Sequence, residues 1–295
     1  MEIFKRDADF APRKVLDGLC YLTVCGDIIE VKQMTSRNSK QNIQFLENSD
    51  FYQVLSTGEI KKKNINEKRI DDTKELRKTF KDLRDIINTN VVDVSYCRWV
   101  TLTYAENMTD NKRLCNDFNK FIKRFKYYCD TKNYGHFEYI NAVEPQGRGA
   151  WHCHLLFIFD RKAPYIANKD LKELWSHGFV TVKRLSGDVD NVGAYLTSYL
   201  TDLELNSNDD FSCNCQIKNV NGKKYKKGAR LRLYPANMRI YRTSRGIKKP
   251  QKIVMTPNDL KKYIGSHEPT YQKLIELLDD DFQSLIFTRY YNLKR

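Results

Sequence analysis

The sequence lacks any apolar stretch long enough to cross a bilayer. Its longest uninterrupted aliphatic and aromatic run is residues 155–159, far short of the roughly 20 residues that a transmembrane helix needs. The opening residues, MEIFKRDADF, are charged and do not contain the apolar core of a secretory signal. We therefore expect a cytoplasmic protein without a membrane partner. The hydrophobic share of 41% and aromatic share of 12% predict a folded chain.

Cysteine spacings typical of a zinc site are also missing. The eight cysteines are expected to be reduced, because no secretion signal accompanies them. Cys20, Cys25, Cys213 and Cys215 could supply four zinc ligands, but C-x4-C and C-x-C match the usual spacings poorly. A structural zinc is therefore disfavoured.

Acidic residues are absent from one long segment. The chain has 51 Lys and Arg against 37 Asp and Glu, a formal net charge of +14. Residues 211–258 contain 13 of the basic residues and no acidic ones. A clustered basic surface gains free energy by displacing counterions from phosphates, which favours nucleic acid over a merely solvated basic tail.

The first quarter of the chain predicts strands and one long helix. Residue types and turn signals predict strands at 19–24, 28–34 and 51–60, the last interrupted by a turn at Thr57-Gly58. A helix is expected from Asp71, with Asp72 or Thr73 as its cap. No constellation of catalytic groups occurs in this part.

The middle of the chain predicts a β-α-β-β-α-β order followed by a helix. The expected elements are a strand at 98–104, a helix capped by Thr109-Asp110 through 129, strands at 137–144 and 151–159, a helix capped by Asn168, a strand at 179–184 and a helix at 188–203. This is the ferredoxin-like arrangement, in which the inner strands of an antiparallel sheet carry groups onto one open face and the helices cover the other.

We therefore expect an α+β protein in three segments. These are a β-rich N-terminal region with its helix at 1–90, the ferredoxin-like domain at 91–205, and a basic DNA-binding extension with a C-terminal helix at 206–295.

Two histidines and a glutamate are predicted to share one face of the sheet. His152 and His154 alternate along one strand, so both side chains point the same way. A hairpin symmetric about Arg148 would place Glu144 directly opposite His152, and opposed residues project to one face. Two imidazoles and a carboxylate form an open metal site. The alternative is a pair of strand histidines satisfied by hydrogen bonds.

Two tyrosines stand one helical turn apart in GAYLTSYLTD. Tyr195 and Tyr199 share a helix face, and a tyrosine hydroxyl can act as a covalent nucleophile toward a metal-polarised phosphorus. The alternative is an aromatic stripe that packs into the core beside Val192 and Leu196.

The basic segment interleaves cations with Tyr225, Tyr234 and Tyr241, which suits single-stranded or hairpin DNA, although the tyrosines could instead be core. The candidate DNA-binding residues are Arg148, Lys223, Lys224, Lys226, Lys227, Arg230, Arg232, Arg239, Arg242, Arg245, Lys248 and Lys249.

Taken in order, the strand RWVTLTY, the strand WHCHLLF and the helix GAYLTSYLTD resemble the three motifs of the HUH replication endonucleases, which initiate rolling-circle replication. The Tyr-x-x-x-Tyr spacing is most similar to the two-tyrosine Rep initiators of bacteriophages and plasmids, including the gene II type. Segments YQVLSTGEIK and RLRLYPANMRIYRTSRGIKKP extend the resemblance over most of the chain.

The resemblance implies a site-specific nick in single-stranded or hairpin origin DNA in a bacterial host cell. Glu144, His152 and His154 would hold Mg²⁺ or Mn²⁺, and Tyr195 or Tyr199 would form a 5′-phosphotyrosine and leave a 3′-OH primer. Because no G-x-x-x-x-G-K-[ST] motor motif occurs, a host helicase and polymerase are expected partners.

The chain departs from the family pattern at one point. Many relatives place a Lys three residues after the tyrosine, where this chain has Ser198 and Asp202. Lys183 or Arg184 are possible substitutes, and the first-attacking tyrosine stays open. The alternatives to a replication initiator are a relaxase or transposase with the same chemistry, a non-catalytic origin-binding protein, and a zinc hydrolase.

Overall fold

The computed structural model describes residues 2–6, 13–36, 43–47, 49–62, 73–146, 149–185, 191–201, 203–204, 217–220, 223–226, 233–235, 238–279 and 282–294. Within them the chain divides into two compact units, residues 67–250 and residues 1–66 together with 251–295. Each unit is taken separately below.

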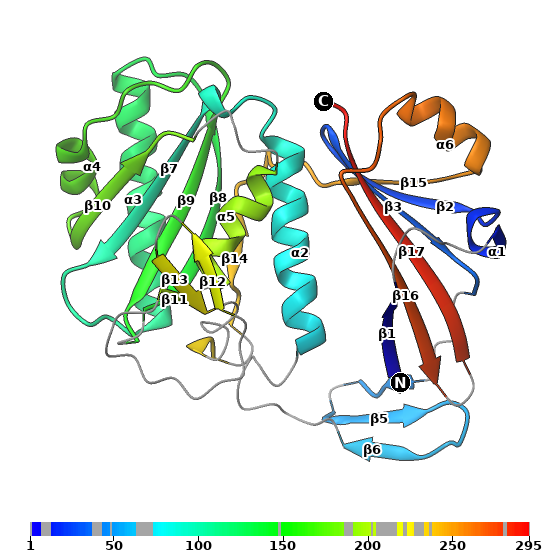
Figure 1. Ribbon diagram of the computed structural model, residues 1–295. Helices are drawn as coiled ribbons and strands as arrows, with labels where there is room; N and C mark the ends of the chain where they lie inside the picture. The colour runs from blue at the N-terminus through cyan, green and yellow to red at the C-terminus, as the bar shows by residue number, and fades with distance from the viewer. Residues whose placement is uncertain are drawn as a thin grey trace. The chain divides into compact units, whose positions relative to one another are not determined.

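The 67–250 unit is built on a five-stranded antiparallel sheet with strand order β10-β7-β9-β8-β14. The strands are β7 (Cys97–Tyr104), β8 (Phe137–Pro145), β9 (Trp151–Phe159), β10 (Gly178–Lys183) and β14 (Tyr241–Thr243). The predicted order of elements is confirmed, and the class is α+β (Figure 1). The fifth strand, β14, comes from the segment that the sequence assigns to the basic extension.

One face of this sheet is covered by α3 (Asn111–Thr131) and α4 (Asn168–Trp175). The predicted Asp110 cap begins α3, since its carboxylate accepts from the backbone N–H of Lys112 and Arg113. Apolar residues of α3 recur every three or four positions and pack against the odd-numbered residues of β9. Trp175 of α4 lies in the same core and is fully buried.

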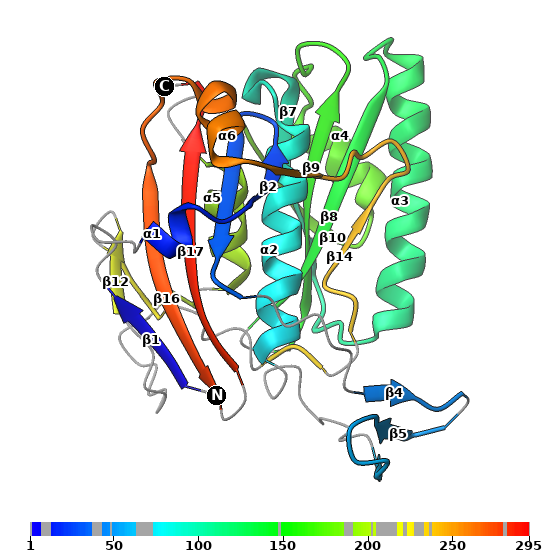
Figure 2. The ribbon, with the colours of Figure 1, turned by 90° about the vertical axis from the view of Figure 1, so that its right-hand side faces the viewer.

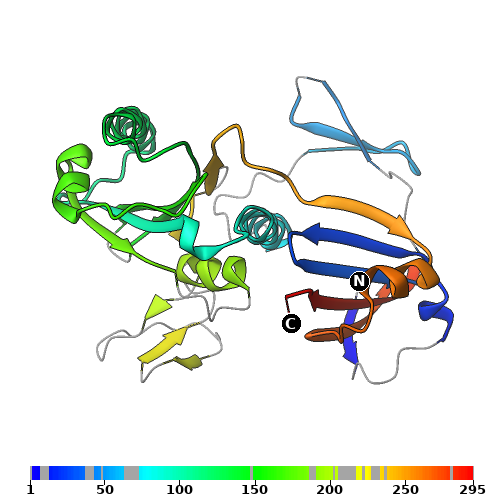
Figure 3. The ribbon, with the colours of Figure 1, turned by 90° about the horizontal axis from the view of Figure 1, so that it is seen from above.

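The other face is partly covered by α2 (Thr73–Asn90) and α5 (Val192–Thr201), so the prediction of a single open face is wrong (Figure 3). Leu83 and Leu196 pack there against Trp99 and Leu156. The cover ends before β10, where Phe179 is 61% exposed. The physical reason is that α2, assigned from the sequence to a separate N-terminal region, has an apolar face that needs a partner, and this sheet provides it.

Two predicted helix starts differ from the structure. The N-cap position of α4 is Ala167, which makes no side-chain cap bond, and Asn168 is the first helical residue. The last predicted helix is shorter than expected, because Leu203–Glu204 form β11. Asp188, Asp72 and Asp202 lie outside the described residues. Strand β11 joins β12 (Ile217–Val220) and β13 (Lys223–Lys226) in a small sheet with order β11-β13-β12.

The other unit brings the two ends of the chain into one six-stranded sheet with order β1-β16-β17-β3-β2-β15 (Figure 2). Its strands are β1 (Glu2–Arg6), β2 (Cys20–Cys25), β3 (Ile28–Met34), β15 (Gln251–Met255), β16 (Tyr271–Asp279) and β17 (Phe282–Asn292). The short helices α1 (Arg13–Leu16) and α6 (Pro257–Ile264) accompany it. The chain thus ends in a β-hairpin and not in the expected helix, and the N- and C-terminal segments are not separate from each other.

A three-stranded sheet completes this unit. It consists of β4 (Ile43–Phe45), β5 (Phe51–Val54) and β6 (Ile60–Lys62) in that order. The predicted turn at Thr57-Gly58 joins β5 to β6, and Gly58 has a positive φ of 73°, which glycine adopts readily.

None of the described helices is long and apolar enough to cross a membrane. The described cysteines are all free thiols, and Cys20 and Cys25 are buried. Cys213 and Cys215 lie outside the described residues.

Candidate functional site

The β8–β9 pair sets the positions of the predicted acidic and histidine residues. Its register places Glu144 directly opposite His152 and Ala142 opposite His154, as the symmetric hairpin predicts. Even-numbered residues of β9 face α2 and α5, because Leu156 packs in that core while Cys153 and Leu155 pack under α3. The three side chains therefore share one face of the sheet. Arg148, at the centre of the connection, lies outside the described residues.

His154 is held on three sides. Its ring stacks on Trp99, with centroids 5.5 Å apart and planes 17° apart, and Thr101 Oγ1 lies 3.2 Å from Nδ1. Its Nε2 hydrogen-bonds Glu144 Oε2. With an ionised carboxylate as acceptor, Nε2 carries the proton and Nδ1 accepts from the Thr101 hydroxyl, so a neutral imidazole satisfies both contacts.

His152 lies nearer the margin of the covered face. It is half-buried, and its ring centroid is 6.1 Å from that of His154. Across β7 it pairs with Thr103, while His154 pairs with Thr101. Glu144 and His154 are only 4% and 8% exposed. The group thus runs from a buried pair, Glu144 and His154, to a more accessible imidazole.

These residues fit a divalent cation by chemistry, although they do not form a finished cage. Within the described ranges no three His, Cys, Asp or Glu side chains stand together as a ready metal cluster. Glu144 Oε2 and His154 Nε2, which hydrogen-bond each other, are both ligand atoms, and His152 shares their face. A carboxylate with two imidazoles is a donor set that divalent metals accept. Binding an ion would exchange the Glu144–His154 hydrogen bond for two metal–ligand bonds.

The tyrosine helix α5 exposes Tyr195. That side chain is 43% exposed, whereas Val192, Leu196 and Leu200 on the opposite side are buried. Tyr195 is therefore not part of a core stripe, which was the alternative reading of the sequence. The side chain of Tyr199 lies outside the described residues, but its position four residues on places it on the helix side of Tyr195.

The start of α5 is fixed against α2 by two asparagines. Asn88 Oδ1 accepts from the backbone N–H of Gly193 at 2.8 Å, and Asn88 Nδ2 donates to Asn191 Oδ1 at 2.9 Å. Asn191 Oδ1 also accepts from the N–H of Ala194 at 2.8 Å, which caps the helix. Sequence reasoning missed this pair, since asparagines 103 residues apart give no signal of contact.

Tyr234 joins α5 to the strand that carries Glu144. Its hydroxyl lies 3.0 Å from the carbonyl oxygen of Val143 and 3.2 Å from that of Leu200, and the residue is 1% exposed. The sequence interpretation of Tyr234 as a stacking surface is therefore wrong, and the alternative that it belongs to the core is confirmed. Tyr241 on β14 is half-buried.

The predicted DNA-binding residues fall into three groups. Arg239, Arg245, Lys248 and Lys249 are exposed, and so is Lys224 on β13, which also carries Lys223 and Lys226. Arg242 is half-buried and donates through Nη2 to Cys115 Sγ on α3. Lys227, Arg230 and Arg232 lie outside the described residues. The possible lysine substitutes, Lys183 and Arg184, are both exposed.

Fold and site together define an α+β protein whose antiparallel sheet carries a Glu–His–His group on two adjacent strands. Residues 97–204, from β7 to β11, match the family model of a replication-associated protein, the one that groups ORF2 with the gene II protein. The match covers less than half of the chain and includes the Glu–His–His group and both tyrosines. This part of the chain is therefore similar to replication-associated proteins. No curated protein and no solved structure shows significant similarity to the chain.

Proposed function

We propose that this chain is a metal-dependent DNA nicking–joining enzyme that initiates rolling-circle replication. The observation that carries the proposal is the β8–β9 register, which aligns Glu144, His152 and His154 on one sheet face within the region similar to replication-associated proteins. Exposure of Tyr195 on α5 adds support, because a nucleophile must reach the phosphate.

The strand order supports a ferredoxin-like HUH core as the finer description of the fold. In chain order the strands β7, β8, β9 and β10 lie as β10-β7-β9-β8, all antiparallel, with α3 and α4 on one face. That is the split β-α-β arrangement, in which the two inner strands are the first and third. In this chain the inner strand β9 carries both histidines.

Glu144, His152 and His154 would hold Mg²⁺ or Mn²⁺, which when bound polarises a phosphate oxygen as a Lewis acid. The phenolic oxygen of Tyr195 or Tyr199 attacks phosphorus and forms a P–O bond as the bond to the 3′-oxygen breaks. The phenolic proton is lost to solvent, and the 3′-oxygen takes up a proton to become the 3′-OH primer. The 5′-phosphate stays on the tyrosine, so the ester conserves the energy needed for rejoining.

The basic residues bind the origin strand by a different contribution. Arg239, Arg245, Lys248 and Lys249 are exposed and suited to phosphates, which give affinity without choosing bases. A host helicase and polymerase would supply unwinding and synthesis. A relaxase or transposase would use the same chemistry on another DNA.

A non-catalytic origin-binding protein is the second candidate, and one observation favours it. Thr101 and Glu144 satisfy His154 without a metal, as the structural reading of the histidines expects. That reading leaves the exposed Tyr195 without a role.

One experiment separates the two candidates. The protein is incubated with Mn²⁺ and labelled single strands that tile the DNA replicon encoding it, and the products are separated under denaturing conditions. A nicking enzyme gives a protein–DNA adduct on one strand and a free 3′-OH fragment. Binding to a strand with no adduct from any tile would favour the non-catalytic protein and sink the nickase.

A further inference from the structure

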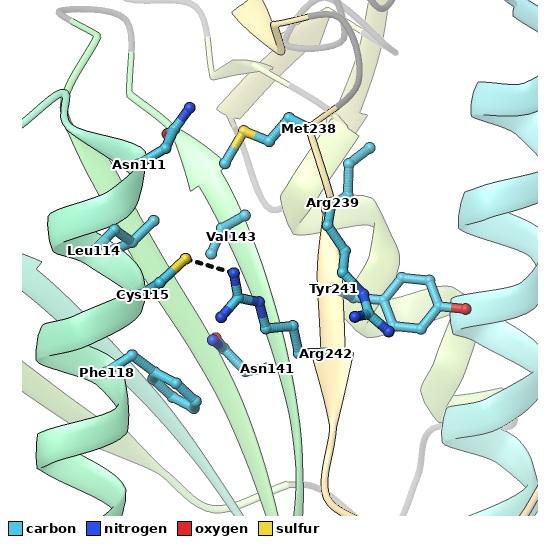
Figure 4. A pocket seen from close by; sticks show the side chains of 11 residues that line it. Asn111, Leu114, Cys115, Phe118, Asn141, Val143, Met238, Arg239, Tyr241 and Arg242 are labelled. Atoms are coloured by element: carbon cyan, nitrogen blue, oxygen red, sulfur yellow. Dashed lines mark hydrogen bonds between the residues drawn. The ribbon is translucent and has the colours of Figure 1, made fainter. Parts of the chain in front are cut away.

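A cavity lies in the 67–250 unit on the sheet face opposite the Glu–His–His group. It measures about 270 Å³ and is lined by α3, β8 and the segment 238–242 that contains β14 (Figure 4). None of its lining residues belongs to the candidate active site. Its size is just below the roughly 300–1,000 Å³ of pockets for drug-sized ligands, so it suits one small ring system.

Most of the cavity wall is apolar. Leu114 and Phe118 line it from α3, Val143 from β8, and Met238 and Ile240 from the segment before β14. Phe118 and Val143 belong to the buried core on this face. A flat, apolar ligand would thus find side chains on both sides.

Asn141 of β8 supplies a buried acceptor. Its side chain is 3% exposed and hydrogen-bonds Cys153 on β9, which engages its amide group on that side. Among the described residues, its Oδ1 atom has no hydrogen-bond partner. A buried acceptor without a donor is costly, so a group that carries an N–H would be bound with a net gain here.

Arg242 of β14 supplies the complementary donor. Its guanidinium reaches toward Cys115 on α3, close to Asn141, whereas Arg239 and Tyr241 point away (Figure 4). Asn141 and Arg242 are paired in the β8–β14 register, so acceptor and donor lie on one face. A guanidinium has five N–H donors and no acceptor, so it seeks a ring nitrogen or carbonyl oxygen.

We propose that this cavity binds one unpaired nucleobase of a DNA strand. The edge of a base presents an N–H donor next to an acceptor, which matches Asn141 Oδ1 beside Arg242, and its ring faces match the apolar walls. The proposal rests on the DNA-binding role proposed above, but not on nicking. It adds a base-recognition pocket on the far face of the sheet from the tyrosines.

The surroundings favour a base attached to a strand over a free nucleotide. The segment that closes the cavity continues through exposed Arg239, Arg245, Lys248 and Lys249, which are spaced along the chain as a path for consecutive phosphates. A free nucleotide offers only one phosphate group to such a path.

Affinity measurements with matched strands test the pocket. The probes are a mixed-sequence single strand about 15 nucleotides long and a sugar–phosphate strand of equal length without bases. Wild type should bind the base-bearing strand more tightly. Asn141→Leu should weaken that binding roughly tenfold and leave the abasic strand unchanged. Arg239→Ala, which removes a charge that points away from the cavity, should weaken both strands alike.

A stability readout separates a binding role from a structural one. Because Asn141→Leu removes an unsatisfied buried oxygen, its thermal midpoint should equal or exceed that of wild type. A lowered midpoint together with equal losses on both strands would overturn the pocket and make Asn141 structural.

Cys115 gives a second test that needs no variant. Its thiol is partly exposed in the cavity, so its rate of alkylation, measured by peptide mass spectrometry, reports occupancy. The base-bearing strand should slow alkylation markedly, and the abasic strand should not. Equal protection by both strands, or by neither while both bind, overturns the pocket and leaves the proposed function standing.

Two further arms identify the source of the base. Protection by free deoxynucleoside monophosphates at the same occupancy as by the strand would overturn the assignment to DNA. Failure of the protein to bind any strand would overturn the proposed function itself, and the base pocket with it.

Discussion

Glu144 hydrogen-bonds His154 diagonally across the β8–β9 pair, although the residue directly opposite Glu144 is His152. Diagonal neighbours in an antiparallel pair are within reach of long side chains. The two imidazoles therefore differ in their surroundings. His154 is buried between Trp99 and Thr101, whereas His152 is more accessible, so replacing each should have a different effect.

His154→Ala should abolish nicking and lower stability while leaving DNA affinity within about twofold of wild type, because salt-dependent DNA binding comes mainly from phosphate contacts. The change leaves the Glu144 carboxylate, which is 4% exposed, without its imidazole partner. Such a loss costs about 1–3 kcal/mol. The measurements are adduct yield, thermal unfolding and affinity across a salt series.

His152→Ala is the matched control. It should also abolish nicking, but with a smaller loss of stability, because His152 is only half-buried. Loss of DNA binding together with nicking in both variants would show that the histidines are structural.

A divalent metal should stabilise the wild type through these three residues. Ligand binding to the native state raises stability by about 2.7 kcal/mol when free ligand is at roughly 100 times its dissociation constant. Mn²⁺ should therefore raise the midpoint of thermal unfolding, and a chelator should reverse the shift. Glu144→Gln, which keeps the shape but removes the anionic ligand, should lose most of it. An equal Mn²⁺ shift in this variant would place the metal elsewhere.

Tyr195→Phe and Tyr199→Phe should each reduce covalent adduct formation, and the double change should eliminate it. Tyr195 is exposed on a helix whose other side is buried, so its hydroxyl can be removed without disturbing the core. The unfolding midpoint of Tyr195→Phe should stay within experimental error of wild type. Mass spectrometry of a nuclease-digested adduct identifies the modified residue. An adduct that survives the double change rules out both tyrosines as nucleophile.

The strand order, most of the element bounds and the Glu144–His152 register were predictable from the sequence, because all depend on local periodicity and hairpin symmetry. Asp110 as the cap of α3 was predictable for the same reason. These signals act over a few residues, where the geometry of strands and helices fixes which side chains share a face.

What the sequence did not reveal depends on contacts between distant residues. The packing of α2 on the sheet joins Leu83 to Leu156, and β1 pairs with β16 from the other end of the chain. An amphipathic helix shows that it has an apolar face, but not which surface covers it. Likewise the tyrosines of the basic segment carry the same residue type whether they stack on bases or, like Tyr234, fill the core.

Tyr234→Phe should lower stability modestly and nicking more than DNA binding. The buried hydroxyl lies within hydrogen-bond distance of carbonyl oxygens of Val143, beside Glu144, and Leu200, in the last turn of α5. Losing a buried hydrogen bond costs about 0.5–1.5 kcal/mol. Because the bond ties α5 to β8, the larger expected effect is on the rate of adduct formation. A fall in stability with an unchanged rate would show that Tyr234 is only structural.

Gly193→Ala should destabilise the protein, although alanine normally stabilises a helix relative to glycine by roughly 1 kcal/mol. A Cβ on Gly193 would lie well inside van der Waals contact of the Arg84 carbonyl oxygen on α2, and close to Asn88 Oδ1. Neither backbone can withdraw without breaking the Asn88–Gly193 bond, so α5 must shift. We expect a loss of about 1–3 kcal/mol by overpacking, measured by denaturant unfolding. Ser198→Ala, on the half-buried side of the same helix, should change stability by less than about 0.5 kcal/mol. If Gly193→Ala were as stable as wild type, the close approach of α2 and α5 would not be what holds the tyrosine helix in place.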